Sequence, residues 1–201
     1  MNEMKHGTIA PRQWHAGTRW LHRFMALGIL GQLLLSLIMA KPDHLDTASE
    51  LEKMAWEGHE WVGLATVGIL VLHWLWLMLP MSDISFAKLF PWSLSSLKQV
   101  GADIAYTVKN RQLPPPTAES KLAGLIHGLG FLVATIMAAT GFALFLVIDF
   151  GDGAGSEAFE QVAEIHETFA TLMWAYLIGH VVAAVWHEYR GERLIAAMFK
   201  V

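Results

Sequence analysis

Four long apolar stretches constrain the fold of this 201-residue chain more than any other feature. A helix needs about 20 consecutive apolar residues to cross the roughly 30 Å hydrocarbon core of a bilayer. The four stretches predict membrane-spanning helices over residues 18–40, 58–79, 121–148 and 164–188. Only 16% of the residues are charged, whereas soluble domains carry about 25%. The sequence therefore predicts an all-α membrane protein, a four-helix bundle that forms one domain over residues 1–201.

The sequence contains no cysteine. Disulfides, iron–sulfur clusters, cysteine-bound zinc and covalently attached c-type haem all need thiols, and they are therefore excluded. The low charge and the positive mean hydropathy also argue against a disordered chain and against one that binds nucleic acid.

Basic residues are distributed unequally between the two sides of the predicted bundle. Of the 14 lysines and arginines, 12 lie in the N-terminal segment, in residues 80–121 and in the C-terminal tail. The other two loops, 41–60 and 149–167, carry two lysines and 12 carboxylates. Cytoplasmic loops hold the excess of Lys and Arg in membrane proteins. We therefore expect both termini in the cytoplasm and the chain in a bacterial inner membrane, in contact with lipid on several passes.

Two connecting segments carry signals of their own. Residues 42–58 predict a short acidic helix on the outer side. Residues 81–120 predict a cytoplasmic interfacial helix, followed by an extended link at the three prolines 114–116.

Histidines recur within the predicted spans at a matched spacing. His59 and His73 are fourteen residues apart on the second span, and His166 and His180 are fourteen apart on the fourth. Fourteen residues make just under four helical turns. The two histidines of each pair therefore lie on the same face of their helix, about 21 Å apart along its axis. Histidine within a membrane helix is costly and indicates a function.

The inner members of these pairs lie level with His22 of the first span and His127 of the third. Two layers of facing imidazoles in a four-helix bundle can hold two b-type haems, each iron bound by histidines of two helices. A zinc or copper site and a proton path are the alternatives. Such metals need ligands within a few ångströms of one another. A proton path more naturally has carboxylates within the membrane, and the apolar stretches of the four spans, residues 20–39, 61–79, 122–148 and 168–186, contain none.

The order of these motifs resembles the bacterial cytochrome b561 family, whose superfamily includes the cytochrome b subunits of hydrogenases and formate dehydrogenases. The resemblance covers about residues 15–200. The similar motifs are Arg19-Trp-Leu-His22, His59-Glu-Trp-Val-Gly63, Thr140-Gly141-Phe142, His166-Glu-Thr168, His180 and His187-Glu-Tyr189.

The resemblance implies an outer haem between His59 and His166 and an inner haem between His22 and His180. His73 stands where relatives often carry arginine. Helix geometry alone would also allow His73, instead of His22, to pair with His180 at the inner haem. The resemblance further implies neighbours or propionate partners of the inner haem: His73, Arg19, Arg23 and His127.

Bis-histidine ligation fills both axial positions, so such a haem transfers electrons instead of binding oxygen. Aromatic rings, a titratable imidazole and a cation suit a quinone. We expect a quinone site at the cytoplasmic side, formed by His187, Trp186, Tyr189 and His15.

At the outer side, 12 carboxylates repel the superoxide anion and attract a cationic redox protein such as a c-type cytochrome. The sequence therefore predicts a di-haem cytochrome that transfers electrons between the quinone pool and a periplasmic partner. A superoxide:ubiquinone oxidoreductase and a cytochrome b subunit of a hydrogenase or dehydrogenase complex are the alternatives. Whether the chain is an enzyme in its own right stays open.

Overall fold

The computed structural model describes residues 14–112, 114, 120–151 and 153–199. Within these residues the chain is helical and has no strand. In chain order the helices are α1 (Ala16–Leu35), the 3-10 helix η1 (Pro42–Thr47), α2 (Glu50–Met78), α3 (Phe86–Leu89), α4 (Leu94–Asn110), α5 (Lys121–Phe150), α6 (Glu157–Tyr189) and α7 (Leu194–Phe199).

The longer helices begin at side chains that satisfy the free amides of a first helical turn. Serine hydroxyls accept a hydrogen bond from these amides at the starts of α2, α4, α5 and α6. At α2 the cap is reciprocal, because Glu52 also accepts from the backbone N–H of Ser49 at 2.8 Å. Capping of this kind typically stabilises a helix by about 1 kcal/mol. The starts of these four helices are therefore encoded locally.

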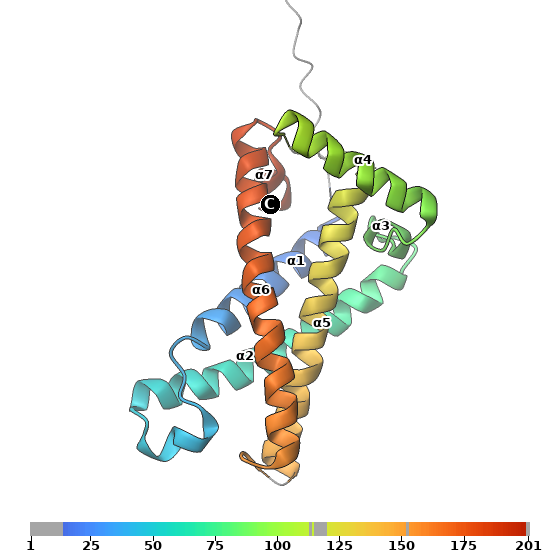
Figure 1. Cartoon of the computed structure of the whole chain (residues 1–201). Coiled ribbons are helices and arrows are strands. Elements are labelled where there is room, and N and C mark those ends of the chain that lie inside the picture. The colour runs from blue at the N-terminus through green and yellow to red at the C-terminus, as the bar shows by residue number, and fades with distance from the viewer. Residues whose placement is uncertain (1–13, 113, 115–119, 152, 200–201) are drawn as a thin grey trace, which may run out of the picture.

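The four long helices form two hairpins (Figure 1). α1 packs along α2, α5 packs along α6, and contacts between α2 and α5 join the hairpins. Figure 1 shows the hairpins crossing, with α4 and α7 near one end and the α5–α6 turn at the other. We call residues 36–60 and 149–167 the acidic end, and residues 80–121 and 190–199, with the start of α1, the basic end.

Three of the described helices are long and apolar enough to cross a membrane: α2, α5 and α6. The first predicted span corresponds to α1, which carries Arg19 and Arg23 in its first turns and ends at Leu35. The chain is thus a multi-pass membrane protein by the length and composition of its helices. Its fourth span stays a prediction.

The predicted ends of several helices were wrong. Residues 42–58 do not form one short acidic helix; they divide between η1 and the first turns of α2, which continues without a break to Met78. The cap at Ser49 starts α2 eight residues before the predicted position, and Ser156 likewise starts α6 seven residues early. The segment 81–120 contains α3 and α4. Most of its predicted extended link, residues 113 and 115–119, lies outside the described residues.

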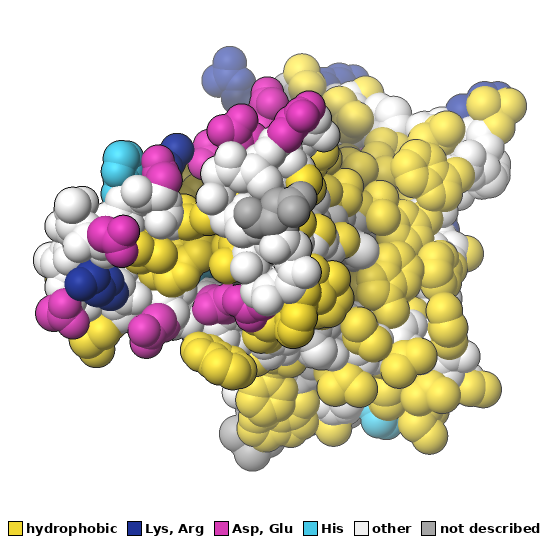
Figure 2. Space-filling model, turned by 90° about the horizontal axis from the view of Figure 1, so that it is seen from below, with side chains coloured by type: hydrophobic (Ala, Val, Ile, Leu, Met, Phe, Trp, Pro, Cys, Tyr) yellow, Lys and Arg dark blue, Asp and Glu magenta, His cyan; other side chains and the backbone are white. Residues whose placement is uncertain are grey.

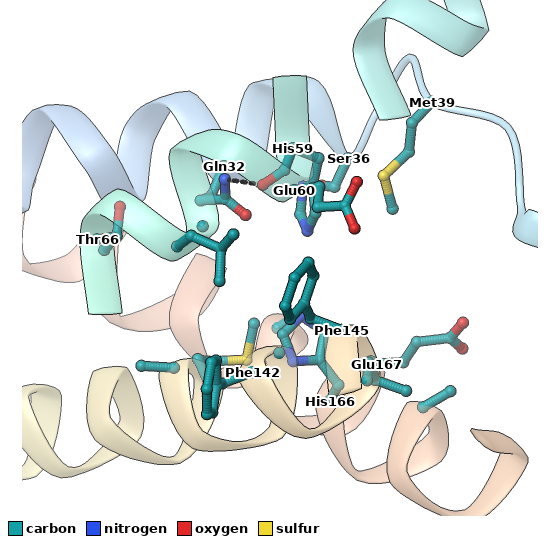
Figure 3. Close-up of a pocket in the computed structure, with 18 of the residues that line it drawn as sticks. Gln32, Ser36, Met39, His59, Glu60, Thr66, Phe142, Phe145, His166 and Glu167 are labelled. Atoms are coloured by element: carbon teal, nitrogen blue, oxygen red, sulfur yellow. Dashed lines mark hydrogen bonds between the residues drawn. The ribbon is translucent and has the colours of Figure 1, made fainter. Parts of the chain in front are cut away.

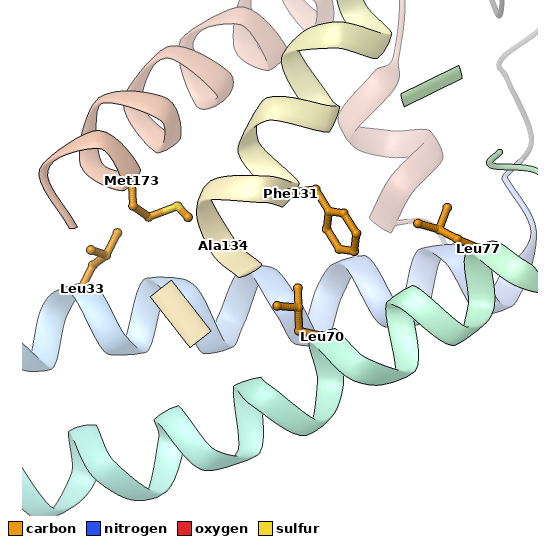
Figure 4. Close-up of a cluster of buried hydrophobic side chains, with 6 residues drawn as sticks. All are labelled: Leu33, Leu70, Leu77, Phe131, Ala134 and Met173. Atoms are coloured by element: carbon orange, nitrogen blue, oxygen red, sulfur yellow. The ribbon is translucent and has the colours of Figure 1, made fainter. Parts of the chain in front are cut away.

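A small apolar core lies between the two hairpins (Figure 4). Its members come from all four long helices and are no more than 7% exposed: Leu33, Leu70, Leu77, Phe131, Ala134 and Met173. Met173 is seven residues from both His166 and His180 on α6, so the core separates the two histidine layers.

Glycine allows α5 to approach α6 closely at Gly130. A Cβ atom added there would overlap the ring of Tyr176, whereas one added at Gly179 of α6 would meet nothing within 4 Å. Close backbone approach through small residues is a main source of helix association in lipid.

We expect Gly130→Leu to lower the thermal stability of the protein, because the new side chain must displace Tyr176. Overpacking of this kind costs about 1–3 kcal/mol. Gly179→Leu is the matched control, since it adds the same side chain in open space. Tryptophan-fluorescence melting in detergent measures both, and equal melting temperatures for the two variants would contradict the packing described here.

Candidate functional site

A cavity of about 800 Å³ opens between the hairpins near the acidic end. Its walls come from all four long helices and from the loop that follows α1. The volume lies within the range of about 300–1,000 Å³ found for ligand and cofactor sites. Figure 3 shows His59 and His166 on opposite walls of this cavity.

His59 and His166 face each other across the hairpin boundary. Their ring centroids are 6.4 Å apart, with an angle of 82° between the ring planes. Both side chains are partly buried. The predicted outer pair is therefore brought together by α2 and α6.

Residues from α1 and α5 hold these two histidines. Gln32 Nε2 donates to the backbone carbonyl of His59 at 2.6 Å, and Thr140 Oγ1 lies 2.8 Å from His166 Nδ1. Beside Thr140, Gly141 lets the His166 ring rest on α5, because a Cβ there would lie 3.2 Å from Cε1. No role was predicted for Gln32. Gln32 could have been noticed in the sequence because it is a polar side chain inside an apolar span.

A second imidazole pair, His22 of α1 and His180 of α6, lies toward the basic end. Their ring centroids are 6.3 Å apart. His127 of α5 lies edge-on to His180 at 5.3 Å, and its Nδ1 donates to the carbonyl of Ala123 at 2.6 Å. Tyr176 stacks on His180 at 5.5 Å.

His73 occupies a different environment from the paired histidines. It is 5% exposed, and its ring packs on Phe131 with centroids 5.1 Å apart. Its Nδ1 is buried without a hydrogen-bond partner.

The two arginines predicted as propionate partners lie on α1 beside His22. Arg23 donates from Nε and Nη2 to the carbonyl of Met198 and lies over the rings of Trp20 and Phe199. Phe199 also contacts His22, at 6.4 Å between centroids. α7 therefore packs against His22 of the basic-end pair. Arg19 is partly buried one turn earlier on the same helix.

The four residues predicted to bind a quinone do not form one contact group. His187 Nδ1 lies 2.5 Å from Glu192 Oε2, at the turn between α6 and α7. Trp186 is 45% and Tyr189 87% exposed.

His15 lies on the other hairpin. Its ring packs on Trp76 at 5.0 Å, and its backbone N–H donates to Asp83. Within the described residues no hydrogen bond, ion pair or ring contact links His15 to His187.

The two imidazole pairs fit a metal held from opposite sides. An imidazole nitrogen binds a first-row metal at about 2.0–2.1 Å, so two rings on opposite sides of one ion have centroids about 6.3 Å apart, once the distance from nitrogen to ring centre is added. Both observed separations, 6.4 and 6.3 Å, match this value. Neither pair is joined by a direct hydrogen bond among the described contacts, and Nδ1 of His22 and of His59 is buried without a partner.

Each pair supplies two nitrogen ligands and no more. Across the part of the chain that the structure describes, no group of three or more His, Asp or Glu side chains converges as a metal site. Structural zinc needs four ligands, whereas a haem iron needs only its two axial positions filled by the protein. The donor set therefore suits haem iron.

Comparison with known proteins agrees with this donor set. No curated protein and no solved structure matches the chain. A sequence profile of one family, described as prokaryotic cytochrome b561, matches residues 13–200 and so covers nearly the whole chain. The expected family resemblance is confirmed: the chain belongs to the prokaryotic cytochrome b561 family, membrane-embedded b-type cytochromes that take part in electron transfer.

Proposed function

We propose that this chain is a di-haem cytochrome b that carries electrons across the bacterial inner membrane. Electrons pass between a quinone at the basic end and a periplasmic redox protein at the acidic end. One observation carries the proposal: two imidazole pairs, His59–His166 and His22–His180, each at the separation of two ligands on one metal. Each pair joins the α1–α2 hairpin to α6.

In this proposal α1 completes a four-span bundle. Its 20 residues rise about 30 Å, which equals the hydrocarbon thickness. Arg19 and Arg23 lie in its first turns, at one end of the span, where a charged side chain costs less than at the centre of the bilayer. The positive-inside rule then places both termini and the basic end in the cytoplasm.

A haem held by two histidines would supply one-electron transfer and would not bind oxygen. The chain holds and orients the imidazoles for this purpose. Gln32 holds the backbone of His59, and Gly141 lets His166 lie against α5. The apolar core between the layers keeps water out of the space between them.

For the basic-end haem we propose His22 as the partner of His180. The separation of these two rings supports the choice, and the ring of His73 packs on Phe131 instead. His73, with its unpartnered Nδ1, is then available as a donor to a haem propionate, together with Arg19 or Arg23. His127 packs against His180 and supports its ring.

For the quinone site we propose the end of α6 near His187. Quinone reduction takes up protons, and the His187–Glu192 pair places two titratable groups in contact beside the basic-end layer. The exposed Trp186 and Tyr189 offer aromatic surface to a ligand that arrives from the bilayer. His15 belongs to the network at the start of α1 and contributes least to this proposal.

For the outer partner we propose a basic redox protein, such as a c-type cytochrome. Figure 2 shows carboxylates around the acidic end with apolar side chains between them. The exposed ones are Asp43, Asp46, Glu50, Glu57, Asp149, Glu157, Glu160, Glu164 and Glu167. Such a field raises the association rate of a cationic partner.

A superoxide:ubiquinone oxidoreductase is a second candidate because Lys41 lines the cavity of His59 and His166. A cation at this position attracts an anion. However, Lys41 Nζ lies 3.4 Å from Glu167 Oε1, and the other carboxylates keep the surrounding field negative. Quinone-dependent consumption of superoxide by the purified protein alone would favour this second candidate.

The wild-type chain should contain two b-type haems, measured as the pyridine haemochrome. His59→Ala and His166→Ala should each remove the same haem, and His22→Ala should remove the other, because one imidazole does not hold a haem that needs two. His44→Ala at the exposed acidic end is the control and should retain both. If the His59 and His166 variants both keep two haems, the proposed ligand set is wrong.

Electron exchange with a basic c-type cytochrome should slow as ionic strength rises from about 0.01 to 0.15 M, because the Debye length falls from about 30 to about 8 Å. Stopped-flow reduction measures this rate. Replacing Glu160 and Glu164 with glutamine should weaken the salt dependence. Lys98→Gln, at the basic end, should leave it unchanged. A rate that is equal for basic and acidic cytochromes at low salt would rule out an electrostatic docking face.

A further inference from the structure

We propose that Thr140 is the positioning residue for His166. Its hydroxyl accepts a hydrogen bond from Nδ1–H of His166 and thereby presents the Nε2 lone pair of that ring to the haem iron. The inference rests on the ligand role of His166 proposed above. By this inference a residue of α5, a helix that supplies no proposed ligand, orients the ligand His166 on α6.

The direction of this hydrogen bond follows from the other contacts of the hydroxyl. Thr140 Oγ1 donates to the carbonyl of Ile136 at 2.8 Å and lies 3.2 Å from that of Met137. A threonine hydroxyl has one proton and can otherwise only accept. Because that proton is directed to backbone carbonyls, Oγ1 accepts from His166 Nδ1 at 2.8 Å. The ring proton of His166 is then on Nδ1, and Nε2 is free to bind a metal.

Gly141 completes the seat for this ring. A Cβ at residue 141 would lie 3.2 Å from His166 Cε1, which is tighter than ordinary contact. The missing side chain thus lets the imidazole approach α5 closely enough for its Nδ1 to reach Thr140. Gly141 and Thr140 together determine where the His166 ring lies and which of its nitrogens carries the proton.

The four proposed ligands are not equivalent in this respect. Among the described residues, His166 is the one of the four for which a hydrogen bond joins a ring nitrogen to the side chain of another residue; Nδ1 of His22 and of His59 is buried without a partner. A hydrogen bond to the outer nitrogen of a metal-bound imidazole fixes its orientation and raises its basicity. A more basic ligand favours the ferric iron, so Thr140 lowers the reduction potential of the acidic-end haem.

The test compares Thr140→Val, which removes the hydroxyl at nearly constant shape, with Thr140→Ser, which keeps it. Thr171→Val is the matched control, because the hydroxyl of Thr171 makes the same type of backbone bond, to Glu167 at 3.3 Å, without a histidine partner. The readouts are optical redox titration, the ferric EPR spectrum and the rate of haem loss to excess apomyoglobin. The acidic-end haem is identified by its absence in His59→Ala.

We expect Thr140→Val to raise the midpoint potential of the acidic-end haem, shift its EPR signal and weaken its binding by about 10- to 100-fold. Thr140→Ser and Thr171→Val should match the wild type, and the basic-end haem should be unchanged in all variants, which reports an intact fold. If Thr140→Val does not fold, Gly141→Ala tests the same seat. Its added methyl group should shift the same EPR signal.

An unchanged potential, EPR signal and binding in a folded Thr140→Val, or the same shifts in Thr140→Ser, would overturn the role of Thr140 while the two-haem proposal stands. If Gly141→Ala is the variant measured, an unchanged EPR signal would likewise overturn the proposed seating of His166 against Thr140 and leave the two-haem proposal standing. A wild-type protein without haem at the acidic end would overturn both.

Discussion

Removing an imidazole from water is costly unless another group replaces the water, and this constraint organises the interior of the bundle. The paired histidines face one another between the hairpins. His59 and His22 bury an Nδ1 that has no partner in the protein. A metal held between each pair would coordinate one nitrogen of each ring and so replace part of the hydration that the rings lose on burial.

That arrangement requires the helices to be held at particular separations. Gly130 lets α5 meet Tyr176 of α6, and Gly141 lets the same helix meet His166 one layer away. In lipid, apolar surface gives little drive for such contacts, so close packing and a few hydrogen bonds supply it. Gln32 and Thr140 are two polar residues that make such bonds across helix pairs.

The existence of the long helices was predicted from the sequence, but several of their ends were not. Apolar length determines where a span must lie, whereas a helix end depends on one or two capping contacts. The early start of α2 was readable in principle from Ser49 and Glu52, which form a standard capping pair. The end of α1 at Leu35 has no glycine or proline before Pro42 to signal it. There Ser36 bonds back to the carbonyl of Leu33, which competes with the helix.

Spacing along one helix is a property of the sequence. The interval of fourteen residues between His59 and His73, and between His166 and His180, already gave two layers on two helices. Spacing alone left open whether His22 or His73 faces His180, because a span that is apolar on nearly every face does not reveal its rotation in the bundle. Tertiary packing decided that His22 faces His180, that His73 packs on Phe131, and that the hydroxyl of Thr140 meets His166. Each of these contacts joins two helices, and its geometry depends on how both are turned and how closely they pack.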